Sequence, residues 1–141
     1  MTDSSGDPRS SGQALLDLMP FAKTIGMTIE SAHPDEVVGS LAWSPERCTA
    51  GGIIHGGALM ALADSLGGVC AFLNLPEGAN TSTIESKTNF FRGVRSDWVR
   101  GVSKPLHVGR TTIVVHTELR DSDNKFVALV TQTQAVLTAS T

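Results

Sequence analysis

Asp64 is the only acidic residue in segment 48–76, and this segment contains no Lys or Arg. Its other residues are mostly glycine, alanine and large aliphatic side chains, a composition typical of a helix that is buried over most of its surface. If residues 57–73 form a helix, the positions one turn before and after Asp64 are all uncharged. A buried carboxylate without a partner loses hydration and destabilises the fold. We therefore expect Asp64 to have a chemical role.

Gly56 and Gly57 lie where this helix would begin. The free N–H groups of a helix start and the helix dipole can stabilise a developing negative charge, and glycine lets a ligand approach the backbone closely. An oxyanion-binding helix start followed by an isolated acid supplies the groups that hydrolysis of an activated carbonyl needs. Without Asp64 downstream, a tight turn into the helix would be the preferred explanation of the two glycines.

The elements that must position these residues can be read from hydrophobic periodicity and turn residues. A helical pattern runs over 11–25 with Gly26 as its stop, and a loop rich in Pro and Gly covers 44–52. β-branched residues in partial alternation predict strands over 27–32, 36–43, 81–91, 97–104, 110–120 and 125–138. The predicted fold is therefore α+β, with one antiparallel sheet of about six strands wrapped around a long central helix.

The 141 residues are enough for one domain, which we place at 14–141 after a disordered tail at 1–13. Hydrophobic and charged contents of 40% and 18% are those of an ordinary globular protein. The first residues are polar, with no hydrophobic signal core, and no apolar run reaches the roughly 20 residues of a membrane span. We expect a cytoplasmic protein that does not bind membranes, and the two cysteines fit a reducing compartment.

Charge is distributed unevenly along the chain. The formal net charge of −3 argues against a nucleic-acid-binding protein, yet segment 86–120 has seven cationic and only two acidic residues, a local balance of +5. A basic segment on an acidic protein indicates a small anionic ligand. Ordinary exposed strand charges are the alternative.

Several motifs together resemble the hotdog-fold acyl-CoA thioesterases, in particular their PaaI-like (phenylacetate-pathway) branch. The sequence Gly-Ile-Ile-His-Gly-Gly-Ala-Leu at 52–59 and Ala-Asp-Ser at 63–65 carry most of the resemblance. Segments 83–90, 107–112 and 128–136 complete it, so that it covers roughly 14–138. The pairing of a His-Gly-Gly motif with an acid nine residues after the histidine is fairly specific, whereas His-Gly-Gly alone would be weak.

The resemblance implies roles for the residues around the central helix. Asp64 would act as general base on water or as direct nucleophile, and His55 would lie beside the oxyanion hole of Gly56 and Gly57. Thr83 would help to hold the attacking water. A histidine at a helix start and a threonine on a strand are otherwise most often structural, and that alternative stays open. Cys48 is a poor candidate nucleophile, because only His55 is nearby in sequence to lower its pKa.

The resemblance also implies where coenzyme A binds. The pantetheine arm would follow the strand end at 90–95 and the turn at 107–112, with arginines near the phosphates. The expected substrate-binding residues there are Phe90, Arg92, Arg95, His107, Gly109, Arg110 and Thr111. One departure is visible, because Thr49 stands where relatives often place Asn or Gln to bind the carboxylate or the thioester.

The implied function is hydrolysis of acyl-CoA to the free acid and CoA, with no metal or redox cofactor. A hotdog dehydratase or hydratase is the first alternative, although such enzymes usually pair a catalytic histidine with the acid, and the helix has no histidine after Asp64. A non-catalytic acyl-CoA-binding module is the second alternative. An apolar helix that one sheet can cover only in part also predicts a homo-oligomer, a dimer or a tetramer. The sequence leaves the acyl group open.

Overall fold

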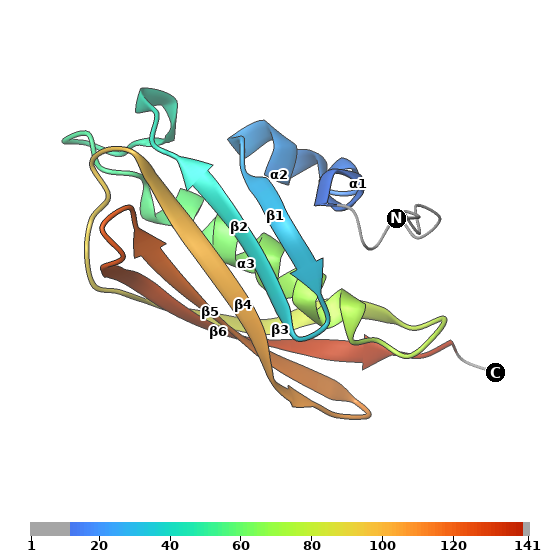
Figure 1. The fold of residues 1–141 in the computed structure, drawn as a ribbon. Coiled ribbons are helices and arrows are strands. Elements are labelled where there is room, and N and C mark those ends of the chain that lie inside the picture. The colour runs from blue at the N-terminus through green and yellow to red at the C-terminus, as the bar shows by residue number, and fades with distance from the viewer. Residues whose placement is uncertain (1–11, 140–141) are drawn as a thin grey trace, which may run out of the picture.

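The computed structural model describes residues 12–139 of the chain. An antiparallel sheet of six strands, in the order β1-β2-β4-β5-β6-β3, curls around the long helix α3 (Figure 1). The elements in chain order are α1 (Gly12–Asp17), α2 (Pro20–Ile25), β1 (Thr28–His33), β2 (Glu36–Ala42), the 3₁₀ turn η2 (Pro45–Arg47), α3 (Gly56–Leu73), β3 (Asn80–Phe90), β4 (Trp98–Val108), β5 (Thr112–Asp121) and β6 (Phe126–Leu137). The predicted hotdog fold is confirmed.

The N-terminal segment differs from the prediction of one helix over 11–25. It forms two short helices, α1 and α2, because Pro20 has no N–H for a continuing helix and instead begins α2. Gly26 ends α2 in the left-handed conformation, with φ of 84°, as the predicted stop requires. α1 begins at Gly12, inside the tail predicted for 1–13, and residues 1–11 lie outside the described part of the chain.

The strands follow the predicted alternation closely. Ile113, Val115, Thr117 and Leu119 of β5 are all buried against the helix side of the sheet. The strand predicted to begin at residue 110 begins at Thr112 instead, because the chain turns between β4 and β5, where Gly109 N–H donates to Thr112 O at 2.8 Å.

Helix α3 approaches the sheet closely over a pair of glycines. Gly39 of β2 and Gly101 of β4 are paired in register, and the Leu66 side chain of α3 lies over both of them. A Cβ atom at Gly39 would lie 2.6 Å from one methyl carbon of Leu66, and a Cβ at Gly101 would lie 2.7 Å from the other. The two missing side chains therefore set the depth at which α3 packs.

Only one side of α3 is covered. Eight of its 18 residues are buried, whereas Gly57, Met60 and Asp64 form an open strip on the opposite side. The expectation that this helix is buried over most of its surface is wrong for the single chain, because the sheet curls around one side and α1 and α2 leave the strip free. By length and composition alone α3 could cross a membrane, but it packs against every strand of the sheet, as a core helix does.

We predict that Gly101→Ala lowers the free energy of unfolding by about 1–3 kcal/mol, because the added methyl overlaps both Leu66 and Leu119. Leu66→Ala alone should cost about 2–5 kcal/mol by leaving a cavity. The double variant should lose less unfolding free energy than the sum of the two single variants, since Leu66→Ala removes one of the two overlaps with the added methyl. Denaturant unfolding of all four proteins measures this coupling, and strict additivity would show that Leu66 does not rest on Gly101.

Candidate functional site

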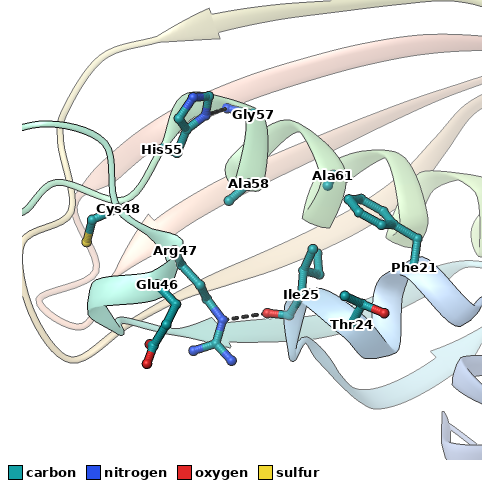
Figure 2. Close-up of a pocket in the computed structure, with 10 residues that line it drawn as sticks. All are labelled: Phe21, Thr24, Ile25, Glu46, Arg47, Cys48, His55, Gly57, Ala58 and Ala61. Carbon is teal, nitrogen blue, oxygen red and sulfur yellow. Dashed lines mark hydrogen bonds between the residues drawn. The ribbon is translucent and has the colours of Figure 1, made fainter.

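The start of α3 is organised by His55. Its side chain caps the helix, with Nδ1 accepting the N–H of Gly57 at 2.8 Å, and its carbonyl accepts the N–H of Ala58 at 2.9 Å (Figure 2). The expectation that both glycine N–H groups are free is therefore wrong for Gly57. Among the described residues the N–H of Gly56 has no acceptor, so it is the available oxyanion donor. Because Nδ1 accepts, a neutral His55 carries its proton on Nε2.

The residues predicted from 90–95 gather at this end of α3. The ring of Phe90 lies over Gly56, where a Cβ atom would be 3.3 Å from Cζ of the ring. Exposed Arg92 and Arg95 follow β3, and Arg95 Nη1 lies 3.5 Å from the carbonyl oxygen of Gly51. Thr49 is also at this end, where its backbone N–H donates to Ile53 O at 2.8 Å, and its side chain is exposed.

Asp64 lies on the open strip of α3. Seven residues of helix place its Cα about 10.5 Å along the axis from Gly57 and within about 20° of the same face. The side chain is exposed in the single chain, which corrects the expectation of a deeply buried acid. The helix still displaces water from one side of the carboxylate, and this burial raises its pKa above the ordinary value. In the described part of the chain no Lys or Arg forms an ion pair with Asp64.

Thr83 is held by a residue that the sequence analysis missed. Gln134 of β6 is buried and donates from Nε2 to Thr83 Oγ1 at 2.8 Å, and its own Oε1 accepts from Thr81 at 3.2 Å. Since Thr83 Oγ1 accepts this bond, its hydroxyl hydrogen stays free to donate to water or to a carboxylate. The detectable signal was an amide side chain at an inward-facing position of a β-strand.

The remaining predicted residues lie at the other end of the sheet. Thr111 O accepts the N–H of Val136, whereas Arg92 N–H donates to Val127 O. Nine residues of β6 separate these two points, roughly 30 Å at 3.4 Å per residue. The predicted residues of this second group are His107, Gly109, Arg110 and Thr111, together with Thr83 near the start of β3. The first group, at the start of α3, consists of Thr49, His55, Gly56, Gly57, Phe90, Arg92 and Arg95. Within one chain the structure does not bring the two groups of predicted residues together.

A cleft of about 680 Å³ lies between α2 and the start of α3, and several of the residues that line it were missed from the sequence. Phe21 and Thr24 come from α2, while His55, Ala58 and Ala61 come from the opposite side (Figure 2). Cys48 also lines this cleft, and its thiol donates to Ser44 O at 3.3 Å. Within 12–139 no three His, Cys, Asp or Glu side chains cluster closely enough to hold a metal ion.

Comparison with known proteins identifies the family. A family model described as the thioesterase superfamily matches residues 51–128, more than half of the chain. The chain belongs to this superfamily. The 1,4-dihydroxy-2-naphthoyl-CoA hydrolase of Escherichia coli strain K12 is 35% identical over 86 residues, which cover 61% of this chain and 63% of that relative.

Two solved structures extend the likeness over most of the thioesterase chain. A thioesterase from Haemophilus influenzae is 25% identical, covers 91% of both chains and has a TM-score of 0.85. A hypothetical thioesterase from Streptococcus pneumoniae, solved with coenzyme A, is 22% identical, with a TM-score of 0.79 over 90% of this chain and 99% of that one, and this likeness shows the fold alone. The predicted family, fold and class of thioester hydrolase are thus confirmed. The PaaI-like branch and the roles of individual residues stay predictions.

The raised pKa of Asp64 gives a prediction for stability. A carboxyl group whose pKa is higher in the folded than in the unfolded state favours folding in its protonated form, and that contribution is lost as the pH rises through the folded-state pKa. Asp64→Asn should therefore raise the Tm at pH 7, and the gain should shrink toward zero as the pH falls to about 4, near the ordinary carboxyl pKa.

Asp17→Asn is the matched control with the opposite sign. The pKa of Asp17 is lowered by its hydrogen bonds with Lys23, at 3.0 Å, and with Gln13, so its ionised form stabilises the fold above the ordinary pKa. This variant should lower the Tm slightly at pH 7 and lose that effect as the pH falls. Thermal unfolding across pH measures both variants, and an Asp64→Asn curve that runs parallel to the Asp17→Asn curve would contradict the prediction.

Proposed function

We propose that the chain hydrolyses acyl-CoA thioesters to the free acid and CoA, with Asp64 as the catalytic carboxylate. The observation that supports this most directly is an unpaired acid of raised pKa on a helix whose first residue, Gly56, keeps a free N–H donor. The thioester oxygen would accept from Gly56 N–H and from Nε2–H of His55, where the positive end of α3 stabilises the oxyanion. Asp64 of the same helix lies about 12 Å further along the axis, so the acting Asp64 would be that of a second copy; it would remove a proton from water, or attack the carbonyl carbon itself.

Both routes end in the same products. If Asp64 is the base, hydroxide adds to the carbonyl carbon, and the C–S bond breaks as the thiolate leaves and takes up a proton. If Asp64 is the nucleophile, the C–S bond breaks first and water hydrolyses the resulting anhydride. The ionised carboxylate is required in either case, so kcat/KM should rise with pH through the raised pKa of Asp64.

We further propose that the working site is completed by a second copy of the chain. β3 is an edge strand that pairs only with β6 among the described strands, and it leaves Ile84 and Phe90 exposed. Antiparallel pairing of two β3 edges about a two-fold axis near their middle would place the Thr83 end of one strand beside the Phe90 end of the other. The two groups of predicted residues, separated in one chain, would then meet twice in a dimer and cover the open strip of α3.

The first test of this function is Asp64→Asn assayed on a panel of acyl-CoA thioesters by release of free thiol. We expect kcat to fall at least about 100-fold, because the amide can neither accept a proton nor attack the carbonyl. The isosteric change leaves no cavity, so KM and the oligomeric state should stay close to those of the wild type. Wild-type kcat in this variant would rule out the catalytic assignment.

The second test is Arg110→Ala, which we expect to raise KM for acyl-CoA about 10- to 150-fold while changing kcat little. A cation at the β4–β5 turn would contact CoA phosphate far from the thioester, and a charge-assisted hydrogen bond of this kind contributes about 1.5–3 kcal/mol. The variant and the wild type should be equal on a short thioester that lacks the nucleotide. If Arg110→Ala and the wild type have equal KM values for full acyl-CoA, Arg110 does not bind the CoA phosphate and is only a surface charge.

Mixing two variants tests whether a site is shared between copies. His55→Ala damages the first group of residues and Arg110→Ala damages the second, so a mixed dimer has one site with both changes and one site with neither. Unfolding and refolding the two proteins together should restore about a quarter of wild-type activity at low substrate concentration, by random pairing. A site built within one chain would show no recovery of activity in the mixture. Light scattering that finds a monomer at micromolar concentration would contradict the dimer itself.

A further inference from the structure

The cleft between α2 and the start of α3 adjoins the proposed oxyanion site. His55 belongs to both, Gly57 of the cleft follows Gly56 of the oxyanion site, and the cleft extends from there toward Ala61 and Phe21 (Figure 2). Its volume of about 680 Å³ lies in the range of small-molecule sites, which is roughly 300–1,000 Å³. A carbonyl held at Gly56 could therefore direct its acyl group into this space.

We propose that this cleft binds the acyl group, and that Phe21 determines which acyl groups are accepted by favouring those larger than acetyl that place apolar surface against its ring. The inference rests on the proposed thioesterase function and adds the substrate class to it.

The floor of the cleft is made of small residues. Ala58 and Ala61 of α3 line it, and Ala61 lies one turn beyond Gly57, about 6 Å along the axis at 1.5 Å per residue. Their methyl groups leave room beside the helix that larger side chains would fill. An acetyl group reaches only about 1.5 Å beyond the carbonyl carbon, one C–C bond, so it cannot extend to the turn of Ala61.

Phe21 supplies the apolar wall opposite this floor. The side chain stands on α2, points toward Ala61 and is 65% exposed, although nearby Ala22 is buried (Figure 2). An aromatic ring left in water loses the stabilisation that burial would give it. An acyl group that lies between the ring and α3 would cover apolar area on both sides, and a longer or bulkier group would cover more.

Arg47 holds this wall in place. Its Nε donates to Ile25 O at the end of α2, and Nη1 donates to Ala42 O at the end of β2, at 3.1 Å. Gly26 leaves room for the guanidinium group at this contact, and its φ of 84° favours glycine there. The Arg47 carbonyl also accepts the N–H of His55 at 2.8 Å. The same residue thus ties α2 and the oxyanion loop together, and a fixed spacing between them can select acyl groups by size.

The test compares kcat/KM for acetyl-, hexanoyl- and phenylacetyl-CoA in the wild type and in Phe21→Ala. We expect the variant to lower the ratio of phenylacetyl-CoA to acetyl-CoA about 10-fold, since it removes the contact that only the larger group makes. The matched control is Leu18→Ala, an equally exposed apolar residue (69%) that faces a separate groove and does not line the cleft. This control should leave the ratio at its wild-type value.

A second variant tests the floor. Ala61→Leu should block the cleft and lower hydrolysis of hexanoyl- and phenylacetyl-CoA more than that of acetyl-CoA. Circular dichroism should show that Phe21→Ala and Ala61→Leu are both folded. If both variants are active and neither changes the ratio of kcat/KM for phenylacetyl-CoA to that for acetyl-CoA, the acyl group binds elsewhere and the inference is wrong. If the wild type hydrolyses no acyl-CoA, the proposed function itself fails.

Discussion

The close approach of α3 to the sheet is the constraint on which the rest of the structure depends. Leu66 can rest on Gly39 and Gly101 only because neither has a side chain, and this contact sets the depth and rotation of the helix. With Leu66 directed at the sheet, Gly57 and Asp64 necessarily lie on the opposite side, since a helix repeats every 3.6 residues. The packing that stabilises the core therefore also presents the acid and the helix start to whatever covers the open strip.

The separation of the two groups of site residues follows from the same geometry. α3 and the strands are extended elements, so residues at their two ends stay far apart however well the core packs. A curled sheet has two edges, and here one of them, β3, contacts α3. A two-fold axis at that edge would bring opposite ends of β3 from two copies together, because antiparallel pairing reverses the direction of one copy relative to the other. Burial of the strip and completion of the site would then be one event.

The fold was largely predictable, because strand alternation and helix composition depend on local periodicity. β5 alternates strictly, and α3 was placed to within one residue at its start. The break at Pro20 was missed because apolar spacing continued across it, although proline alone argues against an unbroken helix. Asp64 was identified by its isolation among uncharged neighbours, but its exposure was not predicted. Periodicity shows which residues share a helix face, and it does not show whether one chain is enough to cover that face. The cleft on α2 depends on tertiary contacts that no local pattern encodes, whereas the capping of Gly57 by His55 is a local contact between residues two apart that was not anticipated.

Polar residues at positions where the pattern demands apolar ones mark the part of the fold devoted to function. Most inward positions of β5 and β6 are aliphatic, yet Gln132 and Gln134 are both buried, and Gln134 lies beside Thr81 and Thr83. Asp64 likewise interrupts an otherwise uncharged helix. A buried amide stabilises the fold only as far as its hydrogen bonds are made, so Gln134 gains little over a leucine of similar size. Its effect is to fix the orientation of the Thr83 hydroxyl on the edge strand. The deviation from binary patterning in β6 thus points to the same seam between α3 and β3 that the isolated acid indicates, and it could have identified Gln134 from the sequence.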